Sequence, residues 1–288
     1  MAYSAEISRA SPGCFLFLVD QSGSMMDDLE AGITKARFVA DALNRTLMQI
    51  AISCRKPEGV LDYFDIGVLA YSGEGVQSGL GGALAGAYLS PISAVANNPL
   101  RVETRRKKQS DGAGGVVETE VKFPVWFDPQ ASGGTPMCAS LATAHDLLAG
   151  WCGSHRRSFP PVVLHVTDGE ATDGDETDVE KAAASVASLA TDDGNVVLMT
   201  LHVTSGDART IRYPASEAGL PDAYARLMFR ASSLLPTVMR EMASGHSLAL
   251  PAGSRAYVFN GQIEDIPTFL DIGTRPLYQR VALPGPGA

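Results

Sequence analysis

The chain lacks a long apolar run and an excess of basic residues. The apolar stretch at residues 14–19 is six residues long and ends at Asp20, too short for a membrane span or the core of a signal peptide. Acidic residues outnumber basic ones, 32 to 23, for a formal net charge of −9. Such a charge opposes binding to nucleic acid or to an anionic membrane. We therefore expect a cytoplasmic protein with neither kind of partner.

Cysteine is also scarce, and its spacing forms no known pattern. The four cysteines, Cys14, Cys54, Cys138 and Cys152, show neither a C-x-x-C pair nor the spacing of zinc ligands. We interpret them as reduced and mostly buried thiols, which fits the cytoplasm. Hydrophobic residues make up 45% of the 288-residue chain, ordinary usage for a protein with a large core.

Apolar runs alternate with helical patterns along most of the chain. The runs predict strands at residues 14–19, 63–71, 161–166, 195–203 and 255–260. The helical patterns cover residues 29–50, 137–151, 179–189, 224–243 and 266–272, and Pro236 must kink or split the fourth of these. This order predicts an α/β fold with a doubly wound, mostly parallel central sheet flanked by helices. We assign one domain to residues 11–273 and a C-terminal tail to residues 274–288.

An insertion at residues 72–130 interrupts this order. Residues 72–86 are rich in glycine, serine and alanine, and we interpret them as a loop or a short helical turn. Residues 100–108 and 116–127 resemble two strands, and the glycines of residues 112–115 suit a turn between them. We expect a β-hairpin inserted at the sheet edge, where it offers a second contact surface. The basic run at residues 105–108 fits a solvated hairpin end.

A doubly wound sheet binds ligands beyond the carboxyl ends of its strands. Three polar clusters of this chain fall at such places, two directly after a strand and one just before a helix. Asp20, Ser22 and Ser24 come directly after the first strand. Thr135 follows two glycines just before a helix, and Asp168 follows the strand at residues 161–166. The two-residue spacing of the serines turns both hydroxyls to the same side of an extended loop.

All five side chains are hard oxygen donors, with no imidazole or thiolate among them. Oxygen ligands of this kind suit Mg²⁺, Mn²⁺ or Ca²⁺ rather than zinc or copper. The D-x-S-x-S cluster, the Gly-Gly-Thr loop and the T-D-G cluster together resemble the metal-ion-dependent adhesion site of von Willebrand factor A domains. The strand and helix order fits this family from about residue 11 to residue 273.

The resemblance implies a specific function. In this family the hydroxyls of Ser22, Ser24 and Thr135 and the carboxylates of Asp20 and Asp168 bind the cation directly or through water. A carboxylate from a partner protein then fills an open coordination position. The chain looks more like the cytosolic bacterial members, such as the tellurium-resistance TerY group, than like the adhesion proteins. That likeness suggests a MoxR-type AAA+ ATPase or a kinase and phosphatase pair as partners, and some relatives couple binding to movement of the last helix.

Each residue of the site has an ordinary alternative role. Thr135 before a proline is a good helix N-cap, and Asp20, Ser22 or Asp168 alone could belong to a turn. The acidic run of Asp173, Asp175, Glu176 and Asp178 could form a second cation site, although helix capping explains it more simply.

The competing function is a metal-assisted hydrolase, such as a phosphatase with Asp20 as nucleophile. A phosphatase of the haloacid dehalogenase type has a second carboxylate two residues after its nucleophile, where this chain has Ser22. We also see no lysine or arginine close to the three clusters in the sequence to stabilise a phosphoryl group. The patterns G-x-S-x-G, H-E-x-x-H and G-x-x-x-x-G-K-[ST] do not occur. We therefore expect a binding module rather than an enzyme.

Overall fold

A computed structural model describes residues 3–30, 32–110, 116–205, 208–244 and 248–261, together with residues 265 and 268. Its strands are β1 (Gly13–Asp20), β2 (Asp28–Glu30), β3 (Ile33–Thr34), β4 (Arg55–Lys56), β5 (Gly59–Val60), β6 (Phe64–Ser72), β7 (Gly75–Ser78), β8 (Ser90–Pro91), β9 (Arg101–Ser110), β10 (Val116–Val125), β11 (Val162–Thr167), β12 (Ala190–Thr191), β13 (Gly194–Asn195), β14 (Val197–His202), β15 (Ile211–Arg212) and β16 (Tyr257–Phe259). Its α-helices are α1 (Lys35–Ser53), α2 (Ile92–Asn97), α3 (Met137–Ser154), α4 (Glu176–Ser188), α5 (Ala223–Ala231) and α6 (Thr237–Ala243), and short 3₁₀ helices occupy η1 (Gly23–Met26) and η2 (Gly82–Leu84).

The central sheet confirms the predicted fold class. Its eight strands follow the order β15-β16-β14-β11-β1-β6-β7, with β8 also paired to β6. The inner strands β16, β14, β11, β1 and β6 run parallel, while β7, β8 and β15 are antiparallel. The strand order reverses between β1 and β11. This reversal is the point at which doubly wound sheets bind ligands, at the carboxyl ends of the strands.

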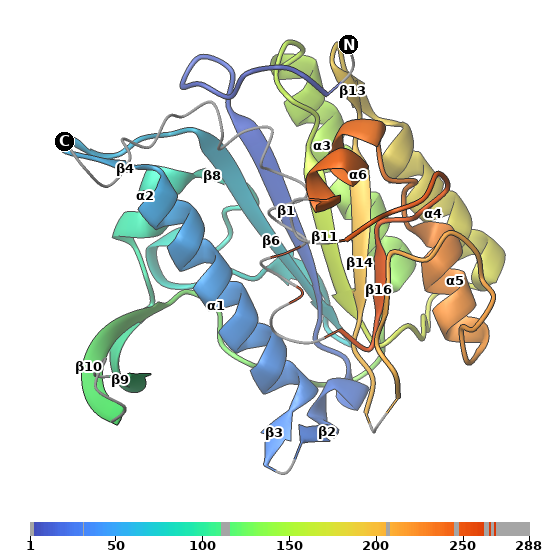
Figure 1. Cartoon of the computed structure of the whole chain (residues 1–288), viewed down its shortest axis with the longest axis horizontal. Helices are drawn as coiled ribbons and strands as arrows, with labels where there is room; N and C mark the ends of the chain where they lie inside the picture. Colours follow the sequence, from blue (N-terminus) through green and yellow to red (C-terminus); the bar gives the residue numbers. More distant parts are fainter. Residues whose placement is uncertain are drawn as a thin grey trace.

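Both faces of β1 are buried, which explains its unbroken apolar sequence. Phe15, Phe17 and Val19 lie in the core that includes residues of α1, α2 and α6. Leu16 and Leu18 face the other core, which includes residues of α3, α4 and α5. Figure 1 shows α1 and α3 on opposite faces of the sheet. A strand covered by helices on both faces needs no polar alternation.

The first helix begins later than the periodicity of the sequence predicts. Leu29 and Ile33 lie in the short β2–β3 hairpin, and α1 starts only at Lys35. The side chain of Thr34 accepts a hydrogen bond from the Arg37 N–H at 3.2 Å, as an N-cap does. Local capping therefore overrides the apolar spacing, and the first turn of α1 brings Lys35 close to the end of β1.

The rest of the chain follows the predicted order, with short unpredicted strands added at β4, β5, β8, β12, β13 and β15. The helical pattern around Pro236 is split into α5 and α6, as predicted. The segment at residues 72–86 contains strand β7 as well as the expected helical turn η2, and α2 was not predicted. Apart from residue 268, which is helical, the predicted helix at residues 266–272 and the tail at residues 274–288 lie outside the described residues.

The predicted hairpin exists as β9 and β10, but its predicted position at the sheet edge is wrong. The two strands pair only with each other within the described residues, because β7 already occupies that edge of the central sheet beside β6. Figure 1 shows the hairpin beside α1. The two strands are described, whereas the glycines of residues 112–115, predicted to form the turn between them, lie outside the described residues.

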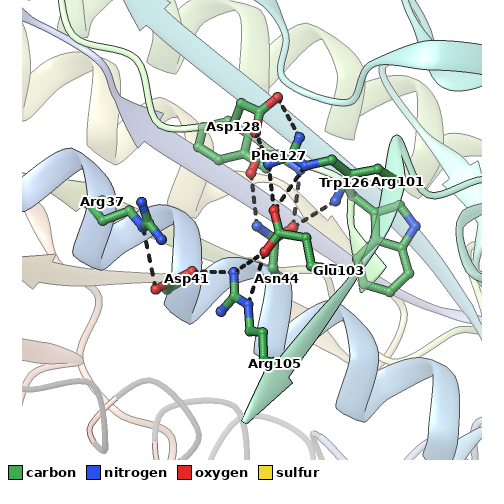
Figure 2. A network of polar contacts seen from close by, with 9 residues as sticks. All are labelled: Arg37, Asp41, Asn44, Arg101, Glu103, Arg105, Trp126, Phe127 and Asp128. Carbon is green, nitrogen blue, oxygen red and sulfur yellow. Dashed lines mark hydrogen bonds and ion pairs between the residues drawn. The ribbon is translucent and has the colours of Figure 1, made fainter. Parts of the chain in front are cut away.

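The base of the hairpin is held to α1 by buried polar contacts (Figure 2). Asn44, which is 2% exposed, accepts hydrogen bonds from the backbone N–H groups of Trp126 and Phe127 at 2.8 and 3.1 Å. Its amide nitrogen donates to the carbonyl of Phe127 at 2.8 Å. Arg105 on β9 adds an ion pair to Asp41 on α1 at 3.0 Å. The polar outer face of α1 thus fixes where the inserted segment leaves and rejoins the fold.

Candidate metal centre

The loop after β1 begins with a buried carboxylate that its neighbours hold in place. Asp20 is 1% exposed. Its Oδ1 accepts a hydrogen bond from the Ser22 N–H at 2.8 Å, and its Oδ2 accepts one from the Thr167 hydroxyl at 2.7 Å. Burial raises the pKa of Asp20 to about 6, the hydrogen bonds from Ser22 and Thr167 lower it, and the nearby charge of Asp168 raises it further. A bound cation would favour the ionised form of such a group.

The two serines of the loop share one side, as their spacing predicts. The Oγ atoms of Ser22 and Ser24 lie 3.1 Å apart, within hydrogen-bond distance. Ser22 is buried, whereas Ser24 is exposed at the surface. The pair therefore places one hydroxyl beside the buried carboxylate and the other where a partner could approach.

Asp168 lies just beyond the neighbouring strand β11, and its two oxygens differ. The pairing of Val19 with Val166 sets β1 and β11 in register, so the carboxyl ends of both strands meet at the same place. Asp168 Oδ2 lies 3.3 Å from Lys35 Nζ. Asp168 Oδ1 is buried and has no hydrogen-bond partner in the part of the chain that the structure describes. An unpaired buried oxygen is costly unless something binds it.

A buried histidine, His202, holds the backbone of the turn at Asp168 through a hydrogen bond. His202 Nε2 lies 2.8 Å from the carbonyl oxygen of Asp168, and its Nδ1 lies 2.9 Å from the Tyr257 hydroxyl. A carbonyl can only accept, so Nε2 carries the proton, and the neutral ring accepts the Tyr257 hydroxyl at Nδ1. Burial lowers the pKa of His202 to about 4, which keeps the ring neutral.

The Gly-Gly-Thr loop lies against the serine loop. The Gly23 N–H donates to the carbonyl of Gly133 at 2.9 Å. Gly133 has a φ of +66°, and a Cβ there would lie 2.7 Å from the Cα of Gly73, so only glycine fits. Thr135 is buried at 4% exposure, and α3 begins two residues later, at Met137.

Thr135 does not take the capping role that was its ordinary alternative. The N-cap position of α3 is Pro136. The Asp173 carboxylate accepts hydrogen bonds from the N–H groups of Cys138 and Ala139 at 3.0 and 2.9 Å, which satisfies the first turn of the helix. The fold thus assigns capping of α3 to a residue far along the chain.

The rest of the acidic run also caps a helix. Asp175 accepts a hydrogen bond from the Asp178 N–H at 3.0 Å, and Asp178 accepts one from the Asp175 N–H at 3.2 Å, a capping box at the start of α4. Across the described residues, no three histidine, cysteine, aspartate or glutamate side chains gather as metal ligands. The acidic run is thereby explained by helix capping.

Lys35 is the residue of the site that the sequence analysis missed. Its Nζ lies 3.3 Å from the carbonyl of Ser24, from Asp27 Oδ2 and from Asp168 Oδ2. Lys35 is 5% exposed. The expectation that no basic residue lies near the three clusters is therefore wrong, because the N-terminal turn of α1 folds back onto the loop after β1. The only signal in the sequence is a lysine beside an apolar helix position.

The residues present fit a hard divalent cation. Asp20, Ser22 and Ser24 follow β1, and Asp168, whose Oδ1 has no partner among the described residues, follows the neighbouring strand β11 at the reversal point of the sheet. Thr135 lies in the loop whose Gly133 carbonyl accepts the Gly23 N–H. No nitrogen or sulfur donor belongs to this set. Oxygen-only sites of this kind select Mg²⁺, Mn²⁺ or Ca²⁺.

Comparison with known proteins gives structural neighbours only. No protein-family model matches the chain, and no curated protein matches it. It is similar to a von Willebrand factor type A protein from Catenulispora acidiphila (18% identity, TM-score 0.37, 66% of this chain and 33% of that chain). It is also similar to the manganese-loaded TRAP protein of Plasmodium vivax (15%, 0.33, 67% and 57%).

A third neighbour is the pilus adhesin SpaC of Lactobacillus rhamnosus GG, with 12% identity and a TM-score of 0.49 over 93% of this chain and 31% of that chain. This chain thus covers less than two thirds of the length of each of these proteins. At these TM-scores the likeness carries no argument, and the α/β fold class rests on the strand order and pairing described above. Among the described helices, none is long and apolar enough to cross a bilayer.

Proposed function

We propose that this chain is a von Willebrand factor A-type domain that binds another protein through a divalent cation, as an adaptor rather than an enzyme. The observation that carries the proposal is the convergence of Asp20, Ser22, Ser24 and Asp168 at the carboxyl ends of β1 and β11. Asp168 Oδ1 is buried there and lacks a protein partner. Thr135, in the adjoining loop, is the fifth proposed ligand. When bound, Mg²⁺, Mn²⁺ or Ca²⁺ would supply a positive centre for a carboxylate of the partner.

The proposed partner is a protein that presents an acidic side chain. The resemblance to cytosolic TerY-like proteins favours a MoxR-type AAA+ ATPase or a kinase and phosphatase pair. A cytoplasmic setting is supported by the cysteines, which are all free in the described structure, as expected in a reducing compartment.

A recess that reaches the loop after β1 is a candidate second contact for the partner, separate from the proposed ligands. It has a volume of about 540 Å³, and its lining includes Gln21, Tyr88, Leu100 and Phe127. Gln21 lies between Asp20 and Ser22 in the chain, but none of the five proposed ligands lines the recess. A mixed apolar and polar lining suits a peptide segment better than a bare ion.

The test is a pull-down from native lysate with wild type and Asp20→Ala, each with Mg²⁺ or with a chelator. We expect a partner that only the wild type retains, and only with Mg²⁺. Two exposed serines give a matched control, because Ser24→Ala removes a proposed ligand whereas Ser188→Ala removes a hydroxyl at the end of α4. A partner held equally by all variants with and without Mg²⁺ would refute the bridging role.

The structure removes one objection to the hydrolase alternative, the lack of a basic residue at the site, and raises two others. Lys35 supplies a cation at the site, but its three contacts occupy the three N–H donors of the ammonium group. Asp20 is 1% exposed and both of its oxygens accept hydrogen bonds, an unfavourable state for a nucleophile. Metal-dependent turnover of a generic phosphoester, abolished by Asp20→Asn, would overturn the adaptor proposal.

A further inference from the structure

Lys35 occupies a position that is unfavourable for a cation. It is the first residue of α1, and the N-terminus of a helix carries a partial positive charge that repels a lysine. The side chain is also 5% exposed, and burial of a charge is costly unless it is paired. Helix stability therefore gives no reason for a lysine here, and its contacts must supply one.

Those contacts tie the ammonium group to the proposed metal centre. One N–H faces the carbonyl of Ser24 and one faces Asp168 Oδ2, each at 3.3 Å. The third faces Asp27, whose side chain is 62% exposed and so is well screened by water. The strongest electrostatic partner of Lys35 is consequently Asp168, whose side chain is 9% exposed.

The pairing divides the work of the two Asp168 oxygens. Lys35 holds Oδ2, whereas Oδ1 is the buried oxygen without a partner among the described residues. The lysine thereby orients the carboxylate with one oxygen left for a cation. It also cancels one of the two negative charges, those of Asp20 and Asp168, that the site offers. Over the three little-exposed groups Asp20, Asp168 and Lys35, without the exposed Asp27, a divalent cation would then give one excess positive charge.

We propose that Lys35 sets the charge of the metal centre, so that the free protein holds its cation weakly and the loaded site captures an anionic carboxylate. This inference rests on the proposed function and deepens it. A site of two unopposed carboxylates would bind the metal more tightly and leave it less attractive to a partner. With Lys35 present, the carboxylate of the partner restores neutrality, and binding of metal and partner become coupled.

The test measures Mn²⁺ affinity by isothermal titration calorimetry, with electron paramagnetic resonance of free Mn²⁺ as a second readout. Lys35→Met removes the charge at similar length, and Lys35→Gln is a second neutral variant should the first fail to fold. Lys35→Arg keeps the charge. Lys122→Met is the matched control, because Lys122 lies on the exposed hairpin and bonds Thr104.

We expect the neutral variants to bind Mn²⁺ about tenfold more tightly. This is the affinity change expected when the repulsion between a divalent ion and a unit positive charge on the other oxygen of the same carboxylate is removed. Lys35→Arg and Lys122→Met should stay within about twofold of wild type. Excess acetate, compared with chloride at equal ionic strength, should raise the Mn²⁺ affinity of wild type more than that of Lys35→Met. The metal-free neutral variants should melt at lower temperature, and Mn²⁺ should raise their melting temperature more.

The outcomes separate the two proposals. Neutral variants that bind Mn²⁺ no more tightly than wild type, or an equal acetate effect in all variants, would overturn the role of Lys35 while the metal centre stands. Absence of Mn²⁺ binding by wild type would overturn both the role of Lys35 and the proposed function.

Discussion

Removal of one buried side chain should release the inserted hairpin from the fold. Asn44 makes three hydrogen bonds to the backbone of Trp126 and Phe127, where the chain leaves β10. Asn44→Ala leaves two N–H groups and one carbonyl unpaired in a buried place. At about 1 kcal/mol net for each bond, the variant should lose about 3 kcal/mol of stability at this contact.

The loss is best measured where it acts. We expect hydrogen exchange at the amides of Trp126 and Phe127 to accelerate by about a hundredfold, the equivalent of about 3 kcal/mol. Urea denaturation measures how much of this loss appears in the free energy of global unfolding. Asn98→Ala is the matched control, because the Asn98 side chain makes a single hydrogen bond to the carbonyl of Ala94 at 2.8 Å and should cost about 1 kcal/mol.

If Asn44→Ala is no more destabilising than Asn98→Ala, and the two amides exchange as in wild type, the anchoring role is wrong. The ion pair between Arg105 and Asp41, half-buried at the same base, would then be the main contact that holds the hairpin to α1. An unanchored hairpin would also be a poor second contact surface, since its position relative to the metal centre would vary.

Two further predictions concern the metal loop and the core. Gly133→Ala sets a Cβ 2.7 Å from the Cα of Gly73, so it should displace the loop of Thr135 and weaken Mn²⁺ binding about tenfold by calorimetry; an unchanged affinity would remove this loop from the site. Burial lowers the pKa of His165 to about 3 in the folded chain. In the unfolded chain its pKa is about 6.5, so as pH falls below about 6.5 the unfolded chain binds a proton at His165 before the folded chain does. By about pH 5, urea denaturation should show about 2 kcal/mol of lost stability from His165 and a similar share from the buried His202, whose pKa is lowered to about 4; a variant His165→Gln with the same pH dependence as wild type would contradict this assignment.

The main elements of the fold were predictable from local patterns. Residues 14–19 are apolar without alternation because helices cover both faces of β1, and the alternation of such strands with helices indicated a parallel sheet. Pro236 was expected to interrupt a helix because it lacks an N–H, and α5 and α6 are separate. The start of α1 was predicted too early, because the cap at Thr34 decides it and apolar spacing does not reveal a cap.

The membership of the candidate site was also largely visible in the sequence. Asp20, Ser22 and Ser24 follow β1 directly, and strand order alone brings Asp168 beside them. Their role as metal ligands stays a prediction, but the spacing of Ser22 and Ser24 already indicated that their hydroxyls lie on one side of the loop. Hard oxygen donors after adjacent strands are a local signal, since each lies within a few residues of the strand that positions it.

Tertiary structure alone decided the partners that come from distant parts of the chain. Lys35 reaches Asp168 across 133 positions, and Asp173 rather than Thr135 caps α3. The hairpin packs beside α1 rather than on the sheet because β7 occupies that edge of the sheet. The sequence by itself determined the parallel strands of the sheet, the two strands of the hairpin, most of the helices and the donor chemistry, since these depend on neighbours in the chain. Charge balance, capping across elements and edge pairing depend on which segments meet in space, and only the folded chain decides that.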